Sequence, residues 1–259
     1  MNTPAQDDSD QKRAETAWAP PTARMKVGEM PAGPRNINVE GRQPMSPLQG
    51  FGQMWQKTFK VRLSGIDKTP SEVMQVWKEN FPKFQPPENR FYPTMSGIKP
   101  GEVLLIEAKV PPLPGMPSML PVSTGVMVLY ADDTTFTVMT PEGHPEAGWN
   151  TFSVYEEDDG LVAQCQSLCR PNDPLYDFFN RFLGASSQQD RIWIHVLVSL
   201  ADHFGVKGQA TTTKVLVDPK VQWSQAKNIW HNAAIRTVFY LFGAPLRWLR
   251  RKDRFGAKA

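Results

Sequence analysis

The stretch Thr140-Pro-Glu-Gly-His-Pro-Glu-Ala-Gly-Trp149 separates two runs that alternate between apolar and polar residues. Proline and glycine favour turns, and alternation with a period of two is typical of a strand with one buried face. The stretch therefore predicts a connection between two neighbouring strands, residues 134–139 before it and 149–155 after it. It also holds the densest group of reactive side chains in the chain.

Further strands are predicted on both sides of this connection. Glu156-Glu-Asp-Asp-Gly160 is typical of a tight hairpin turn. In the first of the other strands, Phe59, Val61 and Leu63 alternate with polar residues, so one face is buried and the other meets water. The remaining predicted strands are 57–63, 102–110, 124–130 and 161–168.

Helix-start signals lie before and after these strands. Thr69-Pro-Ser-Glu72 is a capping box with proline at the first helical position. Asp173-Pro174 predicts a second start, and Gly184 a break before a restart at Ser187-Gln-Gln-Asp190. An apolar stripe then continues to residue 204. This order predicts an α+β fold with helices packed on one face of a curved antiparallel sheet.

Two short motifs resemble a known group of proteins. They are Thr140-x-x-Gly143-His144-Pro-Glu-x-Gly148 with Phe152 downstream, and Ser167-x-x-Arg170-Pro171 before the final helix. Over residues 51–205 the chain resembles an uncharacterised bacterial and plant family of the START and Bet v 1 superfamily, which has the helix-grip fold. That family often has a glutamate after the glycine, where this chain has Trp149 and Asn150. The resemblance implies a cavity between sheet and helix, without a defined reaction.

Charge and composition divide the chain into three parts. Residues 1–47 are polar and proline-rich, which predicts a disordered arm. Residues 48–206 form the predicted helix-grip domain, and residues 207–259 a basic, amphipathic helical tail. Residues 206–259 carry 11 Lys/Arg against 2 Asp/Glu. Such an asymmetry favours contact with an anionic surface, or with the acidic remainder of the chain.

Cys165 and Cys169 lie in one predicted strand, which places their Cα atoms roughly 13 Å apart, too far for a disulfide. The N-terminal sequence lacks the basic and apolar regions of a signal peptide, and no uncharged apolar run reaches 18 residues. We therefore expect a cytoplasmic protein, with peripheral membrane contact as a further option.

The expected cavity would be lined from several elements. His144 beside Glu146 could act as a general base with an orienting acid, although a turn histidine bonded to backbone or carboxylate is the simpler interpretation. Arg170 could bind an acidic ligand group, or it could form a structural pair with Glu146 or Asp173. Small residues on one strand face, including Cys165, leave room for a helix or a ligand. The predicted lining residues are Phe136, His144, Trp149, Phe152, Cys165, Arg170 and Trp193.

No metal site or cofactor is predicted. His144-Pro-Glu146 with the two cysteines resembles a zinc deaminase signature, but the cysteine spacing is one residue too long and Gln164 replaces the proline. Glycine-rich phosphate loops are absent from the sequence.

The tail carries aromatic residues followed by a basic cluster. This pattern favours either an oligomer contact, or packing on the domain, or binding at an anionic membrane interface. Nucleic acid is a weaker candidate, because aromatic and basic residues are not interleaved along a sheet face. The predicted contact residues are Trp230, Phe239, Phe242, Trp248, Arg250 and Arg251.

These observations lead to one preferred function and two alternatives. The preferred function is binding of a hydrophobic small molecule or lipid between sheet and helix. The first alternative is an enzyme of the cyclase or hydrolase kind that uses His144 and Glu146. The second is an interaction scaffold with a filled core and no cavity.

Overall fold

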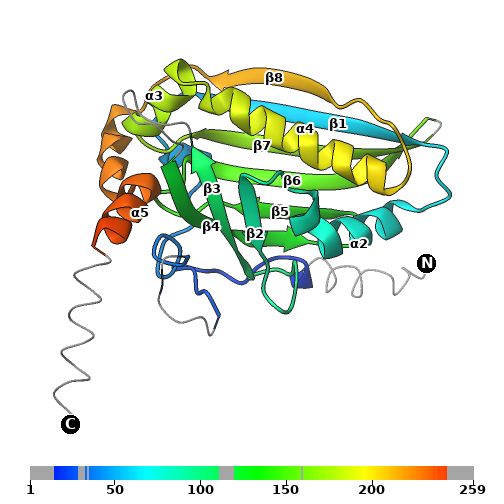
Figure 1. Ribbon diagram of the computed structural model, residues 1–259, viewed down its shortest axis with the longest axis horizontal. Coiled ribbons are helices and arrows are strands. Elements are labelled where there is room, and N and C mark those ends of the chain that lie inside the picture. Colours follow the sequence, from blue (N-terminus) through cyan, green and yellow to red (C-terminus); the bar gives the residue numbers. More distant parts are fainter. Residues whose placement is uncertain (1–14, 29–32, 34, 111–119, 159, 244–259) are drawn as a thin grey trace, which may run out of the picture.

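One antiparallel sheet of eight strands organises the protein (Figure 1). The computed structural model describes residues 15–28, 33, 35–110, 120–158 and 160–243. The strand order across the sheet is β2-β3-β4-β5-β6-β7-β1-β8. The strands are β1 Met54–Ser64, β2 Asn89–Tyr92, β3 Val103–Val110, β4 Leu120–Ala131, β5 Thr135–Met139, β6 Glu146–Glu157, β7 Gly160–Pro171 and β8 Thr211–Asp218.

The helix α2, Pro70–Asn80, starts at the predicted capping box. The Thr69 hydroxyl accepts a hydrogen bond from the Glu72 amide, and the Glu72 carboxylate accepts one from the Thr69 amide at 2.8 Å. The helix buries Val73, Met74 and Trp77 against the sheet. A short 3₁₀ helix, η2 (Phe81–Phe84), follows directly.

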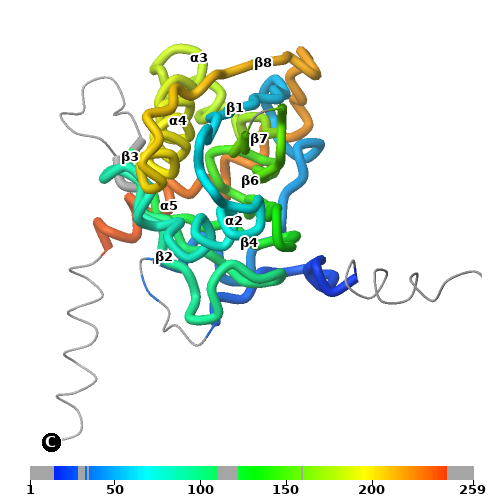
Figure 2. Tube along the Cα trace, turned by 90° about the vertical axis from the view of Figure 1, so that its right-hand side faces the viewer, coloured from blue at the N-terminus to red at the C-terminus, as the bar shows by residue number. Residues whose placement is uncertain are grey.

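The long helix α4, Ala185–His203, lies along the inside of the curved sheet (Figure 2). It follows α3, Pro174–Phe182, whose N-cap Asp173 accepts hydrogen bonds from the Leu175 and Tyr176 amides, as predicted. Gly184 separates the two helices in the left-handed region at φ +73°. The predicted restart at Ser187 is wrong by two residues, because α4 already begins at Ala185.

The core between sheet, α2 and α4 is rich in aromatic rings. Phe136 and Phe152 stack with centroids 4.5 Å apart, and Trp77 and Phe81 meet Phe152 edge-on at 5.5 and 5.2 Å. Trp193 of α4 approaches the same ring at 5.4 Å. Such pairs contribute about 0.5–1.5 kcal/mol each beyond the area they bury. The cluster thus fixes the helix against the middle of the sheet.

The predicted disordered arm is wrong for its described part. Met25, Val27 and Val39 are buried against Val103, Leu105 and Met127, on the sheet face opposite α4. The segment bonds to strand edges as well, since the Ala19 amide donates to the Leu129 carbonyl at 2.8 Å. Few apolar residues suffice here because the folded sheet already offers an apolar surface for them. Residues 1–14 lie outside the described residues.

The predicted domain boundary at residue 206 is also wrong. Residues 211–218 form β8, which pairs with β1 at the edge of the sheet. Its Thr-Thr-Thr-Lys-Val-Leu-Val-Asp sequence is exposed on both faces, so it lacks the alternation that marks a half-buried strand. The short β2 was missed for a related reason, because four residues carry too little pattern.

The remaining C-terminal elements are helical, as predicted. They are the 3₁₀ helix η3, Trp223–His231, and the helix α5, Ala233–Phe242. The small helix η1, Pro47–Gln49, precedes the sheet. The proline-rich loop after β3 lies at 111–119, outside the described residues, as do Trp248, Arg250 and Arg251.

Candidate ligand-binding site

Strand alternation decides which predicted lining residues face the helix. On β6, Asn150 and Phe152 point to the α4 side, so Trp149 points to the opposite face. On β7, Ser167 and Cys169 share the α4 side, so Arg170 lies on the other. The structure therefore excludes Trp149 and Arg170 from the cavity between sheet and helix.

An apolar chamber of about 140 Å³ lies between β3–β6, η2 and the first half of α4. Most of its wall is hydrocarbon from both the sheet and the helices. A dry apolar cavity of about this size in another protein accepts benzene. The lining residues are Phe81, Asn89, Phe91, Ile106, Ala108, Lys109, Thr124, Val126, Val138, His144, Pro145, Glu146, Asn150, Phe152, Asn180, Ala185, Gln188, Gln189, Ile192 and Trp193.

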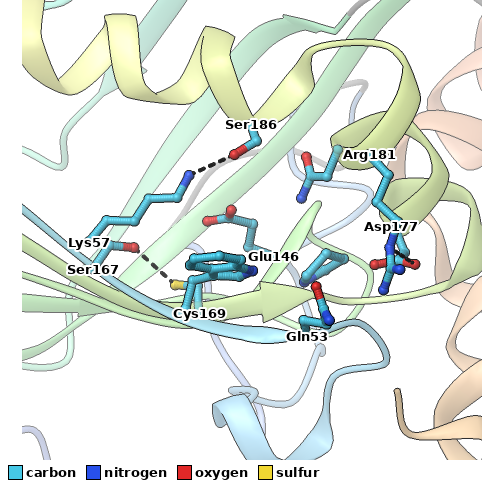
Figure 3. Close-up of a pocket in the computed structure, with 11 residues that line it drawn as sticks. Gln53, Lys57, Glu146, Ser167, Cys169, Asp177, Arg181 and Ser186 are labelled. Carbon is cyan, nitrogen blue, oxygen red and sulfur yellow. Dashed lines mark hydrogen bonds and ion pairs between the residues drawn. The ribbon is translucent and has the colours of Figure 1, made fainter. Parts of the chain in front are cut away.

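A second, polar pocket of about 180 Å³ adjoins the chamber (Figure 3). It lies between the ends of β1 and β7 and helix α3. Glu146 and Asn180 line both cavities, so the polar pocket and the apolar chamber meet at these two side chains. The lining residues are Gln53, Trp55, Lys57, Glu146, Ser167, Cys169, Pro171, Asp177, Asn180, Arg181 and Ser186.

Glu146 is the acidic group at the junction of the two cavities. Burial raises the pKa of its carboxyl above the usual range, and the nearby Lys57 charge opposes that rise. The Gln189 amide donates a hydrogen bond to one carboxyl oxygen. The same carboxylate and burial raise the pKa of the Cys169 thiol, so this cysteine is a poor nucleophile.

His144 does not form the predicted dyad with the Glu146 carboxyl. Its Nδ1 lies 3.0 Å from the Glu146 carbonyl oxygen and 3.1 Å from the Glu146 amide nitrogen, so the ring contacts the backbone of that residue. Burial lowers the pKa of His144 to about 4. The imidazole is therefore neutral at pH 7, and its low pKa makes it a weak general base there.

This depressed pKa predicts a pH-dependent stability. The unfolded chain binds a proton at His144 near pH 6.5 and the folded chain only near pH 4, so stability is full above pH 6.5 and falls as the pH drops towards 4. When the pH falls from 7 to 5, protonation of His144 in the unfolded chain should lower the free energy of unfolding by about 2 kcal/mol. Urea unfolding of the wild type and of His144→Gln at both pH values measures the difference. An NMR titration of the His144 ring with a midpoint near 6.5 would contradict the assignment.

A buried ion network closes one side of the polar pocket. The Lys57 ammonium donates to the Asp190 carboxylate at 2.8 Å and to the Ser186 hydroxyl at 3.0 Å. Lys214 of β8 pairs with the other oxygen of Asp190. Both lysines share the single Asp190 carboxylate, so the network ties α4 to β1 and β8 and keeps one net positive charge.

Three buried polar atoms on the walls of the chamber have no hydrogen-bond partner among the described residues. They are the Thr124 hydroxyl, the Asn150 side-chain oxygen and the Trp193 indole nitrogen. Unpaired buried polar groups are uncommon in folded proteins and cost free energy. Three more such atoms, on Trp77, Arg170 and Asn172, lie outside the chamber lining.

Of the predicted lining residues, His144, Phe152 and Trp193 line the chamber. Phe136 and Cys165 face the same side but are fully buried in the packed core. Cys165 is therefore covered by other core residues and does not line the chamber.

Arg170 lies on the face of the sheet that points away from α4. Its side chain is fully buried, and it donates to the Asp218 carboxylate at 2.8 Å. The ion pair joins the end of β7 to the end of β8. Its partner is therefore neither of the predicted residues, Glu146 or Asp173. The prediction failed because β8, which carries Asp218, was not recognised in the sequence.

Several site residues were not singled out from the sequence, although one signal was available. Lys57 lies two residues before Phe59 in the same strand. The alternation therefore already places this lysine on the buried face, with Phe59, Val61 and Leu63. Asp190 was interpreted as part of a helix start, whereas it binds Lys57. Asn150, Thr124 and the glutamines of α4 carry no pattern that distinguishes them.

The curved antiparallel sheet that holds α4 on its concave side is a helix-grip fold of the START and Bet v 1 kind. No protein-family model and no curated protein matches the chain. A similar solved structure is a START superfamily protein from Mycobacterium smegmatis, with 16% identity, 60% of this chain and 98% of that chain covered, and a TM-score of 0.39.

Two further solved structures show a comparable likeness. The di-domain ARO/CYC StfQ from the steffimycin biosynthetic pathway is 10% identical, with 59% of this chain and 50% of that chain covered, and a TM-score of 0.37. Ara h 8.0201 is 13% identical, with 57% and 97% covered and a TM-score of 0.36. At these identities and TM-scores, no property of these proteins is transferred to this chain.

Two other searches of the described residues gave no candidate. No group of three or more His, Cys, Asp or Glu side chains there could hold a metal ion. No helix in the same part of the chain is long and apolar enough to cross a bilayer.

Proposed function

We propose that this protein binds a small, mostly apolar molecule in the chamber between β3–β6 and α4. The single observation that carries the proposal is an apolar space of about 140 Å³ between the sheet and helix α4, which is partly open to solvent. A drug-sized ligand needs roughly 300–1,000 Å³. The chamber therefore suits a molecule of about one ring better than a lipid with long acyl chains.

The chamber has an apolar body and a polar end. Phe81, Phe91 and Ile106 supply hydrocarbon surface, and His144 and Glu146 stand beside the polar pocket. A ligand with an apolar ring and one uncharged polar group matches this division. The neutral imidazole and the raised pKa of Glu146 favour an uncharged group over a carboxylate at that end.

A thermal unfolding series tests the proposal. Benzene, toluene, phenol, naphthalene and a long-chain fatty acid would be added separately to the full-length protein. A ligand at 100 times its Kd stabilises the folded state by about 2.7 kcal/mol, which raises Tm by several degrees. We expect the one-ring compounds to raise Tm and the fatty acid to have no effect. A Tm that none of these compounds raises would contradict the proposal.

The enzyme alternative makes a separate prediction at His144. A cyclase or hydrolase that depends on this ring would lose turnover in His144→Ala, whereas a binding protein would keep its affinity for the one-ring compounds within a few-fold. The weak basicity of His144 and the contact of its ring with the backbone of Glu146 favour the binding protein. The scaffold alternative predicts no binding of any small molecule in the chamber.

A further inference from the structure

Helix α5 lies at the end of the molecule where α3 also lies (Figure 1). Large aromatic side chains of η3 and α5 are exposed to solvent. Trp230 is 81% exposed, Phe239 72% and Phe242 77%. Burying large apolar side chains is favourable, so leaving three of them in water is costly. We call Trp230, Phe239 and Phe242 the aromatic end surface.

The opposite side of α5 holds this surface in place. Ala233, Ala234 and Thr237 are buried, and the Thr237 hydroxyl accepts a hydrogen bond from the Ser123 amide of β4 at 3.2 Å. Asn232 caps the helix by accepting from the Ile235 amide, and it donates to the Asp173 carboxylate at 2.8 Å. Phe239 and Phe242 therefore project from a fixed helix, as expected of a contact surface.

Positive charge accompanies the aromatic rings. Residues 219–243 contain Lys220, Lys227 and Arg236 and no Asp or Glu. Lys227 is exposed and precedes Trp230 by three residues, so both side chains lie on one face of the 3₁₀ helix. The sequence that follows, 244–259, adds six Lys/Arg against one Asp. Exposed Trp and Phe beside clustered basic residues suit the interface of an anionic membrane.

We propose that the aromatic end surface docks on an anionic lipid bilayer, with Trp230, Phe239 and Phe242 at headgroup level and the basic residues on the anionic lipids. Helix α3 at the same end contributes Asn180 and Arg181 to the polar pocket and exposes Phe182 to solvent. Docking would thus bring the polar pocket close to the bilayer. This proposal does not depend on the identity of a chamber ligand.

Vesicle co-sedimentation of the full-length protein tests the docking. The vesicles would contain phosphatidylcholine alone or phosphatidylcholine with phosphatidylserine, at low and high salt. We expect the protein to pellet with the anionic vesicles at low salt and to be released by salt. The variant Trp230→Ala/Phe239→Ala/Phe242→Ala should bind them at least about tenfold more weakly.

The controls separate membrane binding from self-association. Trp18→Ala and Met95→Ala remove exposed side chains elsewhere and should bind as the wild type does. Lys220→Gln/Lys227→Gln should weaken binding to anionic vesicles only. Wild-type protein that stays in the supernatant with every vesicle would overturn the proposal. So would a dimer in analytical ultracentrifugation that becomes a monomer in the triple aromatic variant without any vesicle binding.

Discussion

Gly143→Ala should reduce the free energy of unfolding by about 3–5 kcal/mol. Gly143 has φ +86°, and a Cβ built there would lie 2.0 Å from the His231 carbonyl oxygen and 2.8 Å from its carbonyl carbon. Both atoms belong to the backbone, so no side-chain rotation relieves the clash. The Gly143 carbonyl also accepts a hydrogen bond from the Ala233 amide at 2.9 Å. Alanine would therefore separate the 140–149 connection from the start of α5.

Gly184→Ala is the matched control for this variant. Gly184 also has a positive φ, +73°, but no heavy atom lies within 4 Å of a Cβ built there. We expect a cost of about 1 kcal/mol, from the backbone conformation alone. Urea unfolding at pH 7 measures both variants. Equal losses would show that conformation, and not contact with His231, explains the requirement for glycine at position 143.

Ala108→Phe should abolish binding of one-ring compounds in the chamber. Ala108 lies on β3 and lines the chamber, so a phenyl ring there would occupy the space that we assign to the ligand. We expect the affinity for toluene to fall at least tenfold, because the ligand and the new ring compete for the same volume. Isothermal titration calorimetry or the Tm increase at fixed toluene concentration measures this change.

Thr137→Phe provides the comparison for Ala108→Phe. Thr137 is on β5, and its hydroxyl lies 3.0 Å from that of Thr151 on the sheet face away from α4. The added ring should leave toluene binding unchanged. Undiminished binding in Ala108→Phe, with the fold intact by circular dichroism, would place the ligand elsewhere.

The sequence predicted the central part of the fold because its strands are half-buried. Alternation in 57–63 and 134–139 fixed both the type of element and its buried face. Capping residues Thr69 and Asp173 located two helix starts for a local chemical reason. Prediction failed where neither signal is present. Strand β8 is exposed on both faces and so shows no alternation. The segment around Met25 is ordered because it packs on the apolar surface of the folded sheet.

The candidate site was predicted less completely, because it depends on which distant side chains meet. His144, Phe152 and Trp193 could be assigned to the cavity from the turn, the strand and the helix that carry them. Arg170 could not be placed without β8, since its partner Asp218 belongs to that strand. The contact between Glu146 and Gln189 joins the start of β6 to a helix 43 residues later, and no local pattern encodes it.

Methyl-resolved NMR of the full-length protein during a toluene titration tests the binding chamber most directly. The account predicts that the methyl signals of Ile106, Ala108, Val126 and Ile192, which line the chamber, shift with one common Kd. Signals of Val27 and Val39, packed on the opposite sheet face, should stay in place. Chamber signals that do not move at saturating toluene, or shifts confined to the opposite face, would contradict the account.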